Sequence, residues 1–242
     1  LAAVAPAYSL AATLGYVVLA VGEKAPAMFV LGFIPMLLVA FGYRALNKVV
    51  PDAGTSFTWT VKAFGPYTGW MCGWGLILAT VIVLSNTAGV AATYLYLFLA
   101  ALLDNPAIRE FGDARLVNVI TTSVFVAMAT WVAYRGMMTA KRVTYVLVSF
   151  QMAMLLLFCA LGLQKALAGG VPSAIPFEWN WLNPFAIESA AALAAGLSLS
   201  IFIYWGWDVS LSANEETSGS EHTPALAALA SIVMLAGTYL LV

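Results

Sequence analysis

Charged side chains are what this sequence has least of. They make up 9% of its 242 residues, whereas soluble domains average about a quarter, and 63% of the residues are hydrophobic. With a mean hydropathy of +0.94, a chain of this length cannot hide its apolar surface in one water-soluble core. Lipid must cover the rest, so the composition excludes a soluble globular protein and predicts an all-α integral membrane protein.

Residues that bind metals or catalyse acid–base chemistry are also scarce. The two cysteines, Cys72 and Cys159, lie in apolar stretches without CxxC spacing, and the single histidine, His222, lies in a polar loop. We therefore expect no metal site and no cofactor. A membrane-embedded enzyme would need clustered acids and bases that this chain lacks. The absence of a basic run or patch argues against a nucleic-acid partner.

Long apolar stretches, by contrast, are abundant. A helix needs about 20 predominantly apolar residues to cross the bilayer. Seven stretches meet this requirement, at approximately residues 1–21, 26–46, 66–103, 115–134, 142–168, 185–213 and 224–242. The third and sixth exceed one crossing, which predicts a tilt, a kink or a break. Because the connections are short, we expect residues 1–242 to form one transmembrane domain. Since the chain starts at Leu1 and ends in an apolar run, we expect that domain to be truncated.

The distribution of lysine and arginine predicts the orientation. Six of the ten basic residues fall in the loops after the second and fourth spans, and cytoplasmic loops are enriched in such residues. The remaining four lie on the other side, together with most of the acidic residues. This pattern places the N-terminus in the cytoplasm.

Two of the spans carry residues that interrupt a helix. Pro6 lies in the first span, and proline removes a helical hydrogen bond and clashes with the preceding turn. Gly206 lies in the sixth, where Asp208 also places a carboxylate in an otherwise apolar stretch. A broken helix at membrane depth survives only where it is buried or lines a cavity. Breaks in corresponding segments of two halves point to the binding site of a transporter.

The chemistry of such breaks suits a zwitterion. The N-terminus of a half-helix presents free N–H groups and partial positive charge to a carboxylate. Freed carbonyls can hold an ammonium group. Simpler interpretations remain open: Pro6 could only kink its helix, and Tyr204, Trp205 and Trp207 could form an interface belt. Asp208 could lie near the membrane surface, although an acid within a span is a functional candidate.

Three stretches resemble the amino acid–polyamine–organocation (APC) superfamily of permeases. One stretch resembles the family signature that follows the second helix. Another resembles the sixth helix of the family with its trailing acidic pair. The last resembles the segment before the fifth helix. They are Pro51 to Trp59 with Phe64-Gly65-Pro66 and Gly69 to Trp74; Phe202 to Asp208 with Asn214 to Thr217; and Tyr134-Arg135-Gly136.

This resemblance implies a LeuT-like inverted-repeat transporter fold, of which the chain holds the first five-helix repeat and the start of the second. It implies a multi-pass protein of the plasma membrane that carries amino acids or related small amines by proton symport or exchange. Some proton-coupled members have a lysine midway along the fifth helix, where this chain has Gln151. The implied substrate-binding residues are Ala5, Pro6, Ala7, Tyr8, Ser9, Phe202, Tyr204, Trp205, Gly206, Trp207 and Asp208, with Phe202 as an aromatic gate.

Three alternatives remain at this point. Asp208 would suit a polyamine or another organic cation as the substrate of an exchanger. A channel would need a polar lining, for which Ser85-Asn86-Thr87 in the third span is the candidate, although such residues also serve helix packing. The chain could also be an inactive fragment of a carrier.

Overall fold

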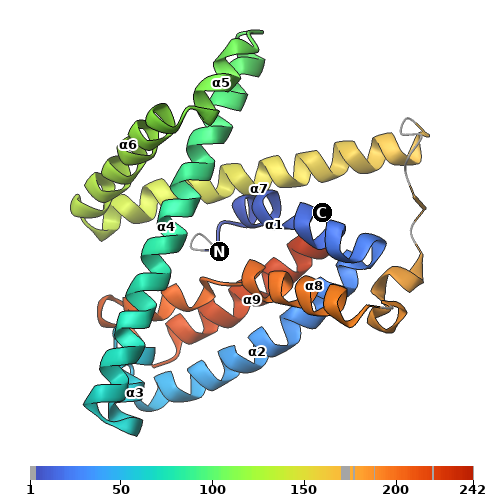
Figure 1. The fold of residues 1–242 in the computed structure, drawn as a ribbon. Coiled ribbons are helices and arrows are strands. Elements are labelled where there is room, and N and C mark those ends of the chain that lie inside the picture. The colour runs from blue at the N-terminus through green and yellow to red at the C-terminus, as the bar shows by residue number, and fades with distance from the viewer. Residues whose placement is uncertain (1–3, 170–174, 177, 188, 220, 242) are drawn as a thin grey trace. The chain divides into compact units, whose positions relative to one another are not determined.

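The regular structure of the chain is helical wherever the structure describes it (Figure 1). The computed structural model describes residues 4–169, 175–176, 178–187, 189–219 and 221–241. The elements, with η marking a 3-10 helix, are α1 (Pro6–Val21), η1 (Gly22–Lys24), α2 (Ala25–Val49), α3 (Ser56–Phe64), α4 (Pro66–Leu102), α5 (Ala107–Asp113), α6 (Arg115–Tyr134), α7 (Met137–Leu167), η2 (Trp179–Leu182), η3 (Pro184–Ala186), α8 (Ala190–Ile203), η4 (Trp207–Glu216) and α9 (Thr223–Leu241).

Six helical stretches of the described residues are long and apolar enough to cross a membrane. One of them, Pro6–Val49, has 44 residues and contains two predicted spans. If straight it would extend about 66 Å, roughly twice the hydrocarbon core of a bilayer. It is not straight, because Gly22 has a φ of 59° at the end of α1 and α1 lies against α2. The chain is therefore a multi-pass α-helical membrane protein.

Three helix ends differ from the predicted spans. The first span was predicted from residue 1, but α1 begins at Pro6, and residues 1–3 lie outside the described part. The fifth was predicted from residue 142, whereas α7 begins directly after Gly136, which has a φ of 95°. The sixth was predicted to begin at residue 185. Its helix α8 begins only after Ser189, whose hydroxyl accepts a hydrogen bond from the amide of Ala192 at 3.3 Å and so caps the helix.

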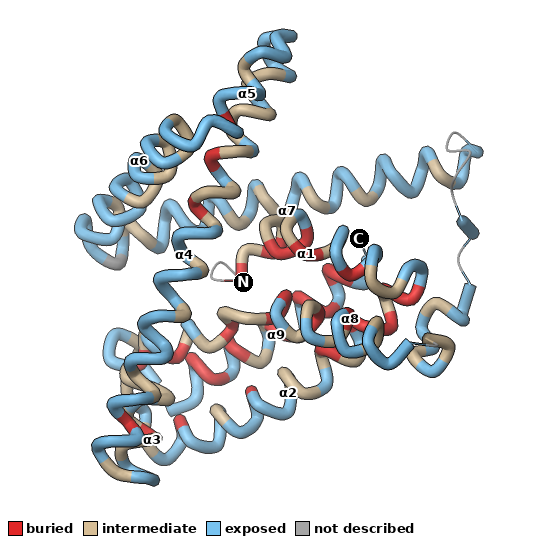
Figure 2. The backbone as a smooth tube through the Cα atoms, in the orientation of Figure 1, coloured by how far each residue is buried: buried red, intermediate tan, exposed pale blue. Residues whose placement is uncertain are grey.

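The described residues form two compact units. The first unit comprises residues 1–59 and 145–242 and contains α1, α2, α8, η4 and α9. In it α8 lies against both α1 and α2, and α9 lies against both α2 and η4. The buried residues of the unit gather along these elements (Figure 2). Their side chains form one hydrophobic cluster, to which α1, α2, α8, η4 and α9 all contribute.

Two glycines allow α8 to approach its neighbours closely. A Cβ added at Gly32 on α2 would lie 2.8 Å from the backbone carbon and oxygen of Ser200 on α8. A Cβ added at Gly196 on α8 would lie 2.9 Å from Val21 and 3.0 Å from Met28. Small residues at such crossings let helix backbones pack closely where lipid supplies no hydrophobic drive.

Replacing Gly32 by alanine should destabilise the first unit by about 1–3 kcal/mol, because the obstacle is helix backbone that cannot rotate away. The measurement is the thermal unfolding midpoint of the detergent-solubilised protein. Gly15→Ala on α1 is the matched control, since nothing lies within 4 Å of a Cβ added there. Equal midpoints for the two variants would contradict the close approach.

The second unit comprises residues 60–144 and contains α4, α5 and α6. Asn118 on α6 is its central polar residue. The side-chain amide nitrogen of Asn118 donates to Thr93 Oγ1 at 3.2 Å and to the carbonyl of Gly112 at 3.1 Å. The hydroxyls of Tyr96 and Thr121 lie 2.7 Å apart nearby. These bonds join α4, α5 and α6 where few side chains are buried.

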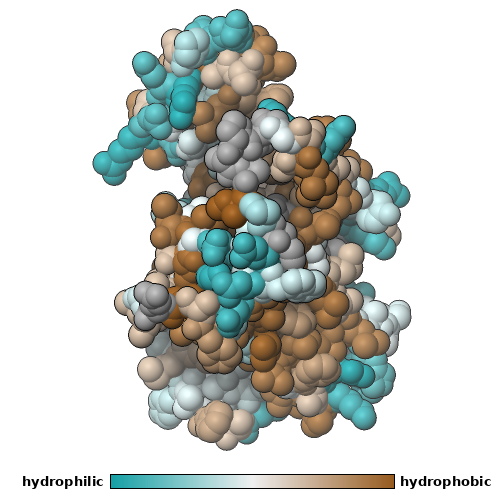
Figure 3. Space-filling view, turned by 90° about the vertical axis from the view of Figure 1, so that its right-hand side faces the viewer, coloured by the Kyte–Doolittle hydropathy of each residue, from teal (hydrophilic) through white to brown (hydrophobic). Residues whose placement is uncertain are grey.

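The surface is largely apolar. Hydrophobic residues cover much of the face shown in Figure 3, and many large apolar side chains are exposed, among them Tyr67, Phe158 and Leu163. Apolar exposure on this scale marks a surface that a membrane covers.

Candidate functional site

The first interruption is the entry into α1. Ala5 has a φ of 46°, in the left-handed region that residues with a Cβ rarely adopt, and Pro6 occupies the first helical position. The hydroxyl of Ser9 donates to the carbonyl of Val4 at 2.7 Å, and the amide of Ser9 donates to the carbonyl of Ala5 at 3.0 Å. Ser9 therefore holds the non-helical residues Val4 and Ala5 against the helix that follows them.

The second interruption separates α8 from η4. Gly206 has a φ of 102°, which ends the helical path after Ile203 and lets η4 begin at Trp207. The last turn tightens, because the amide of Tyr204 donates to Ile201 at 3.3 Å and that of Trp205 to Phe202 at 3.0 Å. The helix break predicted at Gly206 is thus present in the structure.

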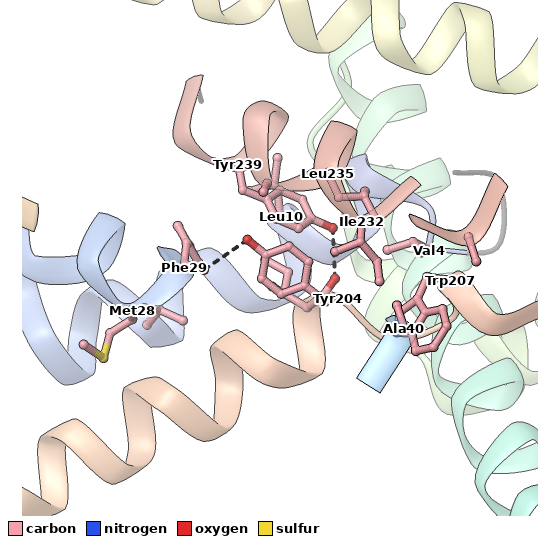
Figure 4. Close-up of a cluster of buried hydrophobic side chains, with 14 of the residues drawn as sticks. Val4, Leu10, Met28, Phe29, Ala40, Tyr204, Trp207, Ile232, Leu235 and Tyr239 are labelled. Carbon is pink, nitrogen blue, oxygen red and sulfur yellow. Dashed lines mark hydrogen bonds between the residues drawn. The ribbon is translucent and has the colours of Figure 1, made fainter. Parts of the chain in front are cut away.

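The two interruptions border the same buried cluster. Val4, just before α1, belongs to it together with Tyr204 and Trp207, which flank the second break. Figure 4 shows these side chains, together with Leu10 of α1, in the cluster. Because α1 also lies against α8, the structure brings together two segments about 200 residues apart in sequence.

The predicted site residues fall into three groups by exposure. Pro6, Ser9, Tyr204 and Trp207 are buried within the protein. Phe202 is 44% exposed. The partly exposed residues are Ala5, Ala7, Tyr8, Trp205, Gly206 and Asp208. The predicted site residues thus differ in exposure, and the buried ones pack within the protein.

The packing of Tyr204 and Trp207 explains their burial. The hydroxyl of Tyr204 donates to the carbonyl of Phe29 on α2 at 3.1 Å, and its ring lies 5.3 Å from that of Tyr239 on α9 (Figure 4). The ring of Trp207 meets that of Tyr43 edge-on at 5.0 Å. Both side chains thus point into the protein, which the sequence pattern did not predict.

The exposed and partly exposed residues near the break are Phe202, Trp205 and Asp208. The rings of Phe202 and Trp205 stack at 6.2 Å with an angle of 26° between them. Asp208 lies in the first turn of η4, where the positive end of a helix favours a carboxylate. The aromatic pair and the carboxylate thus lie on residues that flank the break at Gly206.

A buried polar network at the far end of η4 was not predicted. The side-chain amide of Asn214 donates to Asn47 Oδ1 at 2.6 Å and to the carbonyl of Asp52 at 3.2 Å, which ties η4 to the end of α2. The carboxylate of Asp52 accepts bonds from the amide of Gly54 and the hydroxyl of Thr58, both at 2.7 Å. The stretch from Pro51 to Trp59 therefore forms an ordered turn that leads into α3. The signal in the sequence was two asparagines at the edges of apolar spans.

These features define a multi-pass α-helical membrane protein in which two helix interruptions share one buried core. The family model described as "Amino acid permease" matches residues 2–242. The chain therefore belongs to the amino acid permease family, and its recognition as an APC superfamily member is confirmed.

Three curated relatives are transporters or permeases by name. The methylthioribose transporter of Bacillus subtilis (strain 168) is 24% identical over 218 residues, which cover 88% of this chain and 45% of that protein. The branched-chain amino acid permease BcaP of Lactococcus lactis subsp. cremoris (strain MG1363) is 27% identical, covering 73% and 38%. BcaP of B. subtilis (strain 168) is 26% identical, covering 78% and 40%. The chain thus spans less than half the length of these relatives. No solved structure matches it.

Proposed function

We propose that this chain is part of a secondary transporter that carries amino acids across the plasma membrane, with the substrate bound at the interruptions before α1 and after α8. The observation that carries the proposal is the placement of both irregular segments at one buried cluster. Family membership and the named relatives support transport as the activity. The same features argue against an enzyme.

The entry into α1 suits the carboxylate of the substrate. Pro6 has no N–H, so the first amide of the helix that can reach outward belongs to Ala7. The first turn of a helix provides no intrahelical acceptor for such an amide, and the helix dipole adds partial positive charge. Ala5 and Ala7 carry only methyl groups, which lets a ligand approach the backbone.

The break after α8 suits the ammonium group. The carbonyls of Ile201 and Phe202 already accept the amides of Tyr204 and Trp205. The carbonyl of Trp205 lies in the turn itself, on a partly exposed residue. We assign it as the acceptor for the ammonium group. The exposed ring of Phe202 would cover the substrate and act as a gate.

The side chains that line this site favour one class of substrate. Stacked aromatic rings and two alanines favour a neutral, apolar amino acid side chain, which agrees with two relatives being named for branched-chain amino acids. Asp208 supports a second candidate, a polyamine or other organic cation, since its partly exposed carboxylate lies beside the break.

The fold that accompanies this function is the LeuT-like inverted repeat. In it α1 and α8 with η4 would be the matching broken helices of two repeats, and residues 1–242 would hold one repeat and the start of the next. The N-terminus would lie in the cytoplasm, as the distribution of basic residues predicts. A proton would be the coupling ion.

The test is binding of radiolabelled amino acids, amines and methylthioribose to membranes that contain the complete protein. Saturable binding of branched-chain or other neutral amino acids supports the proposal. Preferential binding of diamines would favour the cation exchanger. Absence of binding across the panel, with the protein folded, would refute the amino acid assignment, and steady ion conductance in a planar bilayer would favour a channel.

A further inference from the structure

At the end of α8, a side chain from another helix takes up the carbonyl of a buried residue, Ile203. The carbonyl of Ile203 is followed by the turn at Tyr204, Trp205 and Gly206, and Ile203 is 1% exposed. An unpaired carbonyl in such a place is costly. Its partner is the hydroxyl of Tyr239 on α9, which donates to it at 2.9 Å (Figure 4).

We propose that Tyr239 is a positioning residue of the substrate site: its hydroxyl holds the Ile203 carbonyl and thereby sets the conformation of the turn at which the substrate binds. The inference rests on the proposed function, and it adds α9 to the elements that shape the site. Tyr239 does not touch the substrate in this arrangement, because it is 2% exposed.

The position of the Tyr239 ring does not depend on its hydroxyl. The ring lies 6.1 Å from that of Phe29 on α2 and 5.3 Å from that of Tyr204. Packing on both sides keeps the ring in place when the hydroxyl is removed. A change from tyrosine to phenylalanine at residue 239 therefore removes the hydrogen bond to the Ile203 carbonyl, together with the contact of the hydroxyl with the Ser9 side chain, and leaves the cluster filled.

The hydrogen bond matters because the carbonyl has no substitute partner. In an intact helix the same carbonyl would accept the amide four residues later, but Gly206, with its φ of 102°, ends that pattern. Without the Tyr239 hydroxyl, the peptide after Ile203 can lower its energy by rotating toward a new donor. That rotation moves the partly exposed Trp205 and Gly206, which carry the proposed contact with the ammonium group.

The experiment compares Tyr239→Phe with the wild type in the complete protein, using the amino acid that binds best in the panel above. We expect KM to rise about tenfold while Vmax changes little, and the unfolding midpoint to fall by a few degrees because a buried carbonyl loses its donor. Hydrogen exchange of the amides of Trp205 and Gly206 should be faster in the variant, and this readout needs no substrate.

Two further variants make the test specific. Tyr96→Phe also removes a tyrosine hydroxyl, one that lies 2.7 Å from Thr121 Oγ1 in the second unit, and it should leave KM and exchange at the turn unchanged. Installing 4-aminophenylalanine at residue 239 restores a donor and should restore KM. This second variant keeps the test decisive if Tyr239→Phe does not fold.

The outcomes separate the two proposals. If the wild type binds no amino acid, the proposed function fails, whatever the exchange rates show. If the wild type binds and Tyr239→Phe has unchanged KM and unchanged exchange at the turn, only the positioning role is overturned. A fall in the unfolding midpoint with KM unchanged, or no rescue by a folded 4-aminophenylalanine variant, would also overturn it.

Discussion

Replacing Gly206 by leucine should weaken amino acid binding by about 10- to 100-fold in a protein that still folds and inserts. Gly206 has a φ of 102°, and a residue with a Cβ is strained there by about 1–3 kcal/mol. The backbone would relax toward a helical path, which moves the carbonyl of Trp205 away from the substrate. Equilibrium binding of a radiolabelled amino acid to purified protein measures the loss.

Two variants control for the bulk of leucine and for the loss of glycine. Asparagine tolerates the left-handed region better than other residues do, so Gly206→Asn should retain more affinity than Gly206→Leu. Gly162→Leu on α7 adds the same side chain where nothing lies within 4 Å, and it should bind as the wild type does. Wild-type affinity in Gly206→Leu would remove the break from the binding site.

The second large effect is expected at Asn214. Asn214→Ala removes the donor to both Asn47 Oδ1 and the carbonyl of Asp52, at a residue that is 2% exposed. We expect the free energy of unfolding to fall by about 1–3 kcal/mol, because the fully buried Asn47 loses a hydrogen-bond donor that water does not replace. The unfolding midpoint of the solubilised protein should drop by several degrees.

Asn180→Ala makes the same substitution on an exposed residue of η2 and should leave the midpoint within error of the wild type. A midpoint for Asn214→Ala equal to that of Asn180→Ala would show that the network around Asn214 does not hold η4 to α2. Binding measured beside the midpoint would show whether the effect reaches the substrate site.

That the chain lies in a membrane, and that its sixth span is broken at Gly206, followed from sequence alone. Composition decides whether lipid must cover a chain, and apolar runs of bilayer length indicate where it crosses. Gly206 was identified because glycine adopts positive φ without strain, which is a local property. The break in the sixth span appeared where this residue predicted it. The start of α8 was placed too early, because the cap at Ser189 is a single side-chain bond within a polar stretch.

The sequence did not predict which of the neighbouring aromatic residues at the break is buried. Tyr204 and Trp205 are adjacent aromatics that the sequence assigned together to the pocket wall. The structure buries Tyr204 against Phe29 and Tyr239 and leaves Trp205 partly exposed. The partners that decide this lie on α2 and α9, so no local pattern around residue 204 contains the information.

The sequence by itself thus determined that this protein lies in a membrane, where its backbone leaves the helix and which family it belongs to. Those properties depend on composition, on the conformational range of single residues and on short motifs. Only the tertiary structure decided which side chains near the break are buried and which are exposed. It did so because the Asn47–Asn214 bond and the Ile203–Tyr239 bond join residues on different helices, and such pairs exist only once the helices have packed.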